Sequence, residues 1–197
     1  MTPEPSAFPQ MTDAGLLQAA AAGSHAGFAE IVNRHYQPVY RLVWRLTNGA
    51  ADAEDMAQDA FVKLWKNPLQ VREAGALKGW LMRVAANAVI DRSRRPRAAT
   101  LDDAPEVEDR QARPDAPLER AQAARLVDRR IAELPDRQRL ALSLVYFEGL
   151  TNIEAAAVLE VSVDALESLL ARARRGLKDS LAAEWRDLLG GLAEMGQ

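Results

Sequence analysis

The chain has 197 residues, of which 48% are hydrophobic and 27% are charged, and its net charge is −3. This composition excludes a disordered or collagen-like chain and allows one or two small domains. No stretch approaches the roughly 18 consecutive apolar residues of a membrane span, and no secretory signal is expected, so we predict a cytoplasmic protein without membrane insertion. Cysteine is absent and the chain has only two histidines, which favours a binding protein over an enzyme, without cofactor or metal.

Charge is unevenly distributed along the chain. Residues 78–97 carry six basic side chains and one acid, whereas residues 98–119 carry two basic and seven acidic ones. A compact basic segment is typical of a nucleic-acid surface. The overall charge therefore hides a candidate DNA-binding stretch that is followed at once by an acidic one.

Four helices are expected in the first half of the chain, because apolar residues recur there with the helical period and no sustained alternation of β-branched residues occurs. Ser24 is the expected N-cap of the second helix, and Asn48 and Gly49 supply its stop. Asp52 is the expected N-cap of the third helix. Caps and periodicity together place the four helices at about 12–23, 24–48, 52–67 and 77–94.

A linker separates this half from a second helical unit. Residues 97–117 are rich in Pro, Ala, Asp and Glu and contain few large apolar residues. Beyond them we expect a helix from about 118 to 134 and another from Pro135 to Phe147. Thr151 and Glu154 then form a capping box that opens a short helix, and Ser162 caps a longer one that reaches Leu181 or beyond.

Residues 151–178 have the layout of a helix-turn-helix, in which a short capped helix, a tight turn and a longer helix follow one another. The side chains expected to face inward are Ile153, Ala156, Ala157, Leu159, Val161, Leu166 and Leu170. An ordinary pair of antiparallel helices is the alternative interpretation. The basic cluster of Arg172, Arg174, Arg175 and Lys178 favours DNA binding, because phosphate neutralisation supplies most non-specific affinity.

The basic helix at 78–97 is a second candidate nucleic-acid surface. Its cations are Lys78, Arg83, Arg92, Arg94, Arg95 and Arg97, and Asp91 is its only acid. Trp80 either fills the core between helices, which is the preferred reading for this residue alone, or stacks on an unpaired base. A solvated helix face is the alternative for the arginines.

Five segments, taken in order and with their spacing, resemble one known family. They are 40–47 (YRLVWRLT), 53–65 (AEDMAQDAFVKLW), 80–87 (WLMRVAAN), 134–139 (LPDRQR) and 146–151 (YFEGLT). The family is the extracytoplasmic-function (ECF) group of bacterial RNA polymerase sigma factors. The first three segments resemble sigma region 2 and the last two resemble region 4.

The resemblance implies an all-α fold of two small domains. A sigma domain 2 helical bundle would occupy 24–97 and a sigma domain 4 helix-turn-helix would occupy 118–182, joined by a flexible acidic linker at 98–117. An N-terminal segment at 1–23 and a C-terminal extension at 183–197 lie outside them. By resemblance the linker enters basic channels of the polymerase, although its composition equally fits a plain solvated tether.

The resemblance also implies partners and surfaces. Asp55, Gln58 and Asp59 share one helix face, which in the family docks on the β′ clamp helices of core RNA polymerase, while domain 4 meets the β flap. Acids that merely solubilise a helix N-terminus are the alternative. Family members are commonly held inactive by an anti-sigma factor, so such a partner is expected.

Promoter DNA is the remaining implied partner. The surface expected to capture a flipped base of the −10 element consists of Lys78, Trp80, Arg83, Asn87, Arg92, Arg94 and Arg95. The surface expected to read the −35 element in the major groove consists of Ser162, Asp164, Ala165, Ser168, Arg172, Arg174 and Arg175.

The chain departs from the family at two positions in the second helix of the helix-turn-helix. Glu167 and Leu169 stand where the family usually has Lys or Arg. A glutamate repels phosphates and accepts a hydrogen bond only from a cytosine amino group, and leucine offers none. We therefore expect weak or unusual −35 recognition.

Two other classes of protein fit the sequence less well. A stand-alone helix-turn-helix regulator with an N-terminal sensing domain would need a dimer seam or a ligand pocket, and the first unit shows neither a heptad pattern nor converging polar residues. An enzyme is disfavoured because His25 and His35 have no evident acid partner and Asp55 and Asp59 lack further metal ligands.

Overall fold

The computed structural model describes residues 5–71, 76–94 and 126–194, and gives side chains for 8–71, 76–92 and 126–182. Every regular element in these ranges is helical, so the predicted all-α fold is confirmed. The predicted linker at 98–117 lies outside the described residues. Among the helices that are described, none is both long enough and apolar enough to span a membrane.

The first half of the chain contains the four predicted helices and two short 3-10 turns. In chain order these are η1 (Pro5–Gln10), α1 (Asp13–Ala21), α2 (His25–Thr47), α3 (Ala53–Lys66), η2 (Pro68–Gln70) and α4 (Leu77–Arg94). The Ser24 hydroxyl accepts a hydrogen bond from the backbone N–H of Gly27 at 3.2 Å, and Asn48 ends α2 with a left-handed φ of 56°. The predicted start and stop of α2 are therefore confirmed.

The predicted cap of α3 is wrong in its chemistry. Asp52 precedes α3, but its carboxylate makes no capping hydrogen bond to the helix. It pairs instead with the guanidinium of Arg92 on α4. A full positive charge from another helix competes successfully with a neutral backbone N–H for the carboxylate.

The second half begins with helical residues 126–132 and continues through four elements. These are α6 (Asp136–Leu142), a π-helical turn η4 (Ser143–Phe147), α7 (Asn152–Leu159) and α8 (Val163–Glu194). The capping box is present: Thr151 N–H donates to the Glu154 carboxylate at 2.8 Å, and Glu154 N–H donates to the Thr151 hydroxyl at 3.3 Å. Ser162 caps α8 by accepting from Ala165 N–H at 3.2 Å. The helix-turn-helix layout is confirmed.

The inward face of α7 differs from the prediction at two positions. Ile153 is 74% exposed and Ala157 is exposed, whereas Ala155 and Val158 are buried. The reason is that α7 packs on α4 as well as on α8, so a second stripe of its side chains is covered. The sequence pattern predicts only the packing of α7 within the helix-turn-helix and not its contact with α4.

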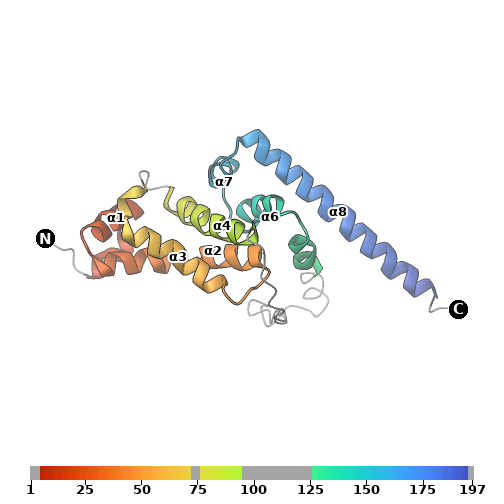
Figure 1. Ribbon diagram of the computed structural model, residues 1–197, viewed down its shortest axis with the longest axis horizontal. Coiled ribbons are helices and arrows are strands. Elements are labelled where there is room, and N and C mark those ends of the chain that lie inside the picture. The colour runs from red at the N-terminus through yellow and green to blue at the C-terminus, as the bar shows by residue number, and fades with distance from the viewer. Residues whose placement is uncertain (1–4, 72–75, 95–125, 195–197) are drawn as a thin grey trace.

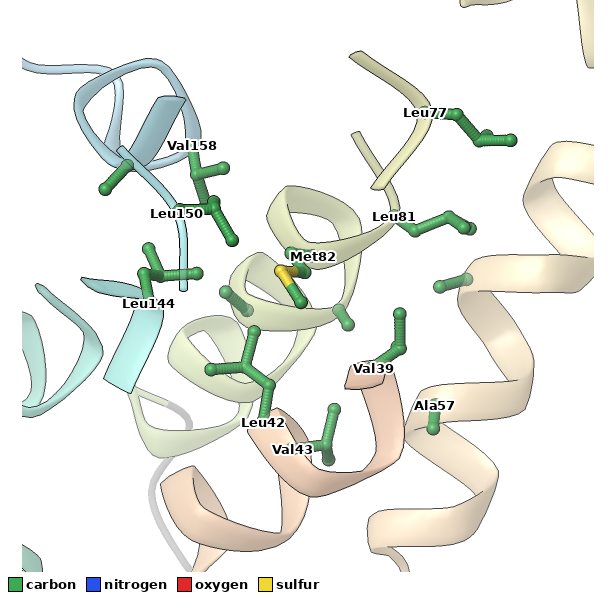
Figure 2. Packing of buried hydrophobic residues seen from close by; sticks show 14 of the residues in the cluster. Val39, Leu42, Val43, Ala57, Leu77, Leu81, Met82, Leu144, Leu150 and Val158 are labelled. Atoms are coloured by element: carbon green, nitrogen blue, oxygen red, sulfur yellow. The ribbon is translucent and has the colours of Figure 1, made fainter. Parts of the chain in front are cut away.

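One hydrophobic core runs through both halves of the chain. It joins the buried side chains of α2, α3 and α4 to those of α6, η4 and α7. Leu144, Leu150 and Val158 face Leu42 and Met82 of the first half (Figure 2). A smaller cluster of Ile131, Leu134, Leu142 and Ala173 holds α8 against α6, and the rest of α8 projects away from the body (Figure 1).

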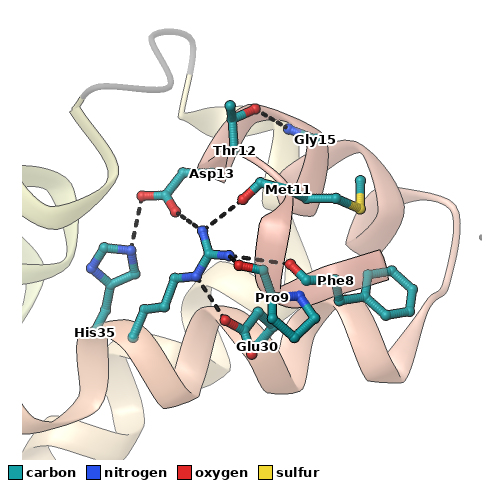
Figure 3. Close-up of polar contacts among 9 residues, drawn as sticks. Phe8, Pro9, Met11, Thr12, Asp13, Gly15, Glu30 and His35 are labelled. Carbon is teal, nitrogen blue, oxygen red and sulfur yellow. Dashed lines mark hydrogen bonds and ion pairs between the residues drawn. The ribbon is translucent and has the colours of Figure 1, made fainter. Parts of the chain in front are cut away.

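Polar contacts hold the N-terminal segment against α2 (Figure 3). Its Phe8 side chain is buried in the main core. The guanidinium of Arg34 donates to the backbone carbonyls of Phe8 (3.1 Å), Pro9 (2.9 Å) and Met11 (2.8 Å). It also pairs with the carboxylates of Asp13 (3.2 Å) and Glu30 (2.8 Å). The hydrogen bond that Arg34 donates to the Glu30 carboxylate, together with the pairing to Asp13, raises the pKa of Arg34 against the opposing effect of burial.

Candidate nucleic-acid interface

Helix α4 presents a pocket between itself and the end of α3. It is an open surface hollow with a volume of about 400 Å³. It is lined by Lys63, Lys66, Gln70, Trp80, Val84, Asn87, Ala88 and Asp91. Two predicted base-binding residues, Trp80 and Asn87, therefore face the same hollow, with an aromatic face and an amide that can both donate and accept hydrogen bonds.

Two lysines of this pocket were not predicted as site residues. Lys63 and Lys66 belong to the last turn of α3, where cations ordinarily complement the helix dipole. This local role does not reveal that the two lysines also lie beside Trp80. The packing of α3 against α4 brings them there.

The other face of α4 meets the second half of the chain. The ammonium of Lys78 donates to the backbone carbonyl of Glu148 at 2.6 Å. Arg83 lies 3.5 Å from the carboxylate of Glu160. These two predicted −10 residues therefore do not share the pocket with Trp80 and Asn87.

The remaining three members of the predicted −10 surface are also separate from the pocket or outside the description. Arg92 is paired with Asp52. The side chain of Arg94 and the whole of Arg95 lie outside the described residues.

A buried ion cluster lies where the two halves meet. The side chain of Glu148 is 1% exposed, and its two oxygens lie 3.4 Å from Arg41 Nη2 and 3.7 Å from Arg45 Nη1. Arg45 also stacks over the ring of Phe147, with 3.8 Å between its guanidinium carbon and the ring centre. Burial lowers the pKa of Arg45, and the charge of Glu148 opposes that shift. The sequence carries no local signal for this cluster, because its members are about a hundred residues apart.

Helix α8 offers a different kind of surface. Asp164, Ser168, Arg172 and Arg175 are exposed and follow one another at helical spacing, so they form one stripe. The Ser162 hydroxyl is engaged in the cap, and Ala165 is half-buried. Arg174 lies off the stripe and donates back to the Leu170 carbonyl at 3.3 Å.

Comparison with known proteins identifies the two halves. Residues 31–99 match the family model described as Sigma-70 region 2, and residues 124–177 match Sigma-70, region 4. The ECF RNA polymerase sigma factor SigM of Mycobacterium tuberculosis (strain ATCC 25618 / H37Rv) is 33% identical over 171 residues, covering 85% of this chain and 84% of SigM. The chain belongs to the ECF sigma factors. The ECF RNA polymerase sigma-E factor of Escherichia coli (strain K12) is 28% identical over 184 residues, covering 87% of this chain and 95% of that protein.

Solved structures agree with this assignment. CnrH in complex with the cytosolic domain of CnrY superposes with a TM-score of 0.65 at 27% identity, covering 87% of this sigma factor and 97% of that chain. The sigma factor RpoE in complex with the anti-sigma factor NepR from Bartonella quintana has the same fold, with a TM-score of 0.60 at 19% identity over 79% of this chain and 96% of that one.

The predicted polymerase-facing side of this sigma factor is open to solvent. Asp55, Gln58 and Asp59 are all exposed on α3, as their spacing predicts. Gln58 donates to the neighbouring Glu54 carboxylate at 3.1 Å. The docking role of this face stays a prediction.

The two departures from the family pattern differ in their surroundings. Glu167 is exposed and accepts a hydrogen bond from the side-chain amide of Asn152 on α7 at 3.3 Å. Leu169 is half-buried and packs against the main core. Glu167 therefore belongs to the exposed surface of the reading helix, whereas Leu169 contributes to the packing of the domain.

The histidines bear on the enzyme alternative. The expectation that His35 has no acid partner is wrong, since its Nε2 lies 2.9 Å from the carboxylate of Asp13 (Figure 3). Asp13 comes from the N-terminal segment, whose docking the sequence did not predict. The His25 ring packs on Trp65 with 4.9 Å between ring centres. Across the described ranges, no group of three or more His, Asp or Glu side chains could hold a metal ion.

Proposed function

We propose that this ECF sigma factor uses three separate surfaces to direct core RNA polymerase to promoters. The exposed face of Asp55, Gln58 and Asp59 docks on the β′ clamp helices. The pocket beside Trp80 takes a base of the −10 element, and the exposed stripe of α8 meets the −35 element. The protein acts in the cytoplasm by binding and carries out no covalent chemistry itself.

The pocket between α3 and α4 is the observation that carries this proposal. Trp80 supplies a stacking face, Asn87 supplies hydrogen bonds, and Lys63 and Lys66 supply positive charge for the backbone of a single strand. Contacts of this kind form only with an unstacked base, so they lower the free energy of melted DNA relative to duplex. Such a pocket assists promoter opening without a chemical energy source.

The −35 surface is weaker in charge than the family pattern leads one to expect. Arg172 and Arg175 provide phosphate contacts, while Asp164 and Glu167 lie at the N-terminal, base-facing end of the same helix. Recognition by this helix therefore depends on the polymerase to hold the domain near the DNA.

Control by an anti-sigma factor is part of the proposal. CnrH, which resembles this chain in sequence and fold, was solved with the cytosolic domain of CnrY bound. The family membership and this similarity support an inhibitor of the same kind here.

Fluorescence anisotropy of labelled promoter DNA tests the function. We expect tight, open-complex binding only when purified core polymerase and the full chain are both present. Replacing Asp55, Gln58 and Asp59 together by alanine should abolish the polymerase-dependent signal. The matched control is alanine at Asp179, an exposed acid of α8 outside the α3 face, which should leave the signal unchanged. Binding of duplex promoter DNA at equal strength without polymerase would instead support the stand-alone regulator.

A further inference from the structure

Glu167 is an exposed acid on α8, the helix of the proposed −35 surface. It lies in the first turns of α8, which begins at Val163. In a helix-turn-helix the N-terminal residues of the second helix lie nearest the base edges. The exposed Asp164, three residues before it, lies on the same side of the helix. Glu167 therefore belongs to the part of α8 that would meet bases.

A side chain of the first helix of the motif holds this carboxylate. Asn152 is the first residue of α7, and its side-chain amide donates to Glu167 Oε1 at 3.3 Å. The capping box of Thr151 and Glu154 fixes the start of α7 directly beside Asn152. A partner from a second helix restricts the rotamers of a glutamate before it meets DNA, so less side-chain entropy is lost on binding. The bond uses Oε1, so Oε2 can accept a hydrogen bond from a base.

The arginines of α8 are placed for a different part of the duplex. Arg172 and Arg175 are exposed and lie about one and two turns further along the helix than Glu167. Arg172 Nε donates to the Ser168 carbonyl at 3.2 Å, which holds its guanidinium beside the helix. Cations contact phosphates and position a helix, whereas contacts to base edges carry the sequence information. The acceptors of α8 thus lie at its base-facing end, and its cations lie beyond them.

A carboxylate distinguishes the four bases by the donors that they present in the major groove. Cytosine presents its N4 amino group, and adenine presents its N6 amino group beside the acceptor N7. Guanine presents the acceptors N7 and O6, and thymine presents the acceptor O4, so both repel a carboxylate. Adenine N7 opposes the carboxylate as well. Cytosine is therefore the base that a carboxylate favours.

We propose that Glu167 selects a cytosine at one position of the −35 element and that Asn152 is the positioning residue that aims its carboxylate. The inference rests on the proposed function, since it requires α8 to enter the major groove. The charge of Glu167 repels phosphates and lowers affinity for every sequence, while the hydrogen bond to cytosine restores affinity for one class of sequence. An acid in place of the family's Lys or Arg thus lowers affinity and raises selectivity.

Base preference at the −35 element tests the role of Glu167. Holoenzyme assembled from core RNA polymerase and the full chain selects from a library of duplexes randomised over both promoter elements. The position with the strongest cytosine preference is then varied in four duplexes, and their affinities are measured by fluorescence anisotropy. The natural chain should bind the cytosine duplex about tenfold more tightly than those with guanine or thymine, as expected for a hydrogen bond to a charged group.

Glu167→Gln is the decisive variant, because it keeps the length of the side chain. If Asn152 retains Oε1, the new amide presents Nε2–H donors where the carboxylate presents Oε2. The preference for cytosine should be lost, and a purine should be favoured, because purine N7 is an acceptor. Asp179→Asn is the matched control: it removes one carboxylate from an exposed position of the same helix outside the −35 surface, and should keep the cytosine preference within about twofold. Glu167→Lys adds a charge that favours every duplex and should gain least on the cytosine duplex.

Asn152→Ala tests the positioning role. It removes the amide and keeps the charge of Glu167, so the preference for cytosine should fall several-fold while affinity for the guanine and thymine duplexes stays within about twofold. A merely structural role of Asn152 would instead lower affinity for all four duplexes equally. Circular dichroism confirms that each variant keeps its helices.

The outcomes separate the inference from the proposed function. A natural holoenzyme that selects a −35 sequence without any cytosine preference, or a Glu167→Gln holoenzyme with the natural preference, would overturn the role of Glu167 while the promoter-directing function stands. A cytosine preference that survives Asn152→Ala would overturn the positioning role. A chain that binds core polymerase but selects no −35 sequence would refute the proposed −35 surface, and the inference with it.

Discussion

Helices α4 and α8, which we propose face promoter DNA, each meet groups that oppose DNA binding, and these groups differ in origin. On α4 the opposing groups come from elsewhere in the fold, since the Glu148 backbone carbonyl that holds Lys78 and the Glu160 carboxylate that faces Arg83 belong to the second half of the chain. On α8 they belong to the helix itself, where Asp164 and Glu167 precede the arginines. The affinity of α4 for DNA can therefore rise when a domain moves. The affinity of α8 for DNA can rise only when the sequence changes or when a partner holds the helix near DNA.

The largest expected effect concerns the α4 pocket. Trp80→Ala should weaken open-complex formation by holoenzyme by about 2 kcal/mol, or about 30-fold, because one base loses its stacking partner. Promoter melting can be followed with a fluorescent base analogue in the −10 element. Trp80→Phe keeps an aromatic face and is the matched control, expected to stay within about threefold. A Trp80→Ala holoenzyme that melts DNA normally would remove the pocket from the mechanism.

A change on α8 should act in the opposite direction. Glu167→Lys removes a repulsive charge and adds a phosphate partner, so affinity for −35 duplex should rise by about 1 kcal/mol and the salt dependence should steepen by about one counterion. Leu169→Arg restores the family residue at the other departure, yet it should bring no gain, because Leu169 packs against the core. Equal gains from both variants would contradict the structural difference between the two positions.

The lysines of the pocket allow the phosphate contacts of the two DNA surfaces to be compared. Lys63→Ala should lower the affinity of the holoenzyme for single-stranded −10 DNA by up to about 1 kcal/mol and reduce the salt slope by about one, as for a phosphate contact. Arg175→Ala on α8 should do the same for −35 duplex and leave single-strand binding unchanged. Filter binding across a salt series distinguishes the two, and an effect of Lys63→Ala on the duplex alone would place it outside the −10 site.

The capping box of Thr151 and Glu154 begins α7, the helix that supports the reading helix α8. The hydrogen bonds from Thr151 lower the pKa of Glu154 below its ordinary value of 4.5, so the capping box stabilises α7 fully above pH 4.5 and this stabilisation is lost as the pH falls through the lowered pKa. Thr151→Ala should cost about 1 kcal/mol at neutral pH. It should also flatten this acid dependence, which amide hydrogen exchange in α7 can measure. Ser180→Ala on α8 lies outside the box and serves as the control.

Local hydrogen bonds explain why so many helix ends could be predicted. Ser24, Thr151 and Ser162 each cap within three residues of their own position, so the signal lies inside a four-residue window. Asp52 has the same local pattern but a stronger partner forty residues away in Arg92, and there the prediction fails. Propensity rules hold where no distant charge competes.

The sequence predicts which helix carries the candidate site, but not which residues lie on which face of that helix. The basic helix and Trp80 are visible in the sequence, yet only the packing of α7 shows that Lys78 and Arg83 face the second domain while Trp80 and Asn87 face the pocket. Glu148 reads locally as the first residue of a turn. Its importance arises from tertiary partners, Arg41 and Arg45, that no spacing rule connects to it.

The π-helical turn at Ser143–Phe147 sets the direction in which Glu148 points from the helix axis. Glu148 N–H donates to the Ser143 carbonyl at 3.0 Å, five residues back, so the turn holds one residue more than an α-helical turn would. Each residue of an α-helix rotates the chain by about 100°, so deleting one residue here would turn Glu148 by about a quarter-turn around the axis, away from Arg41 and Arg45. The length of this turn therefore decides whether the glutamate meets its partners in the first half of the chain.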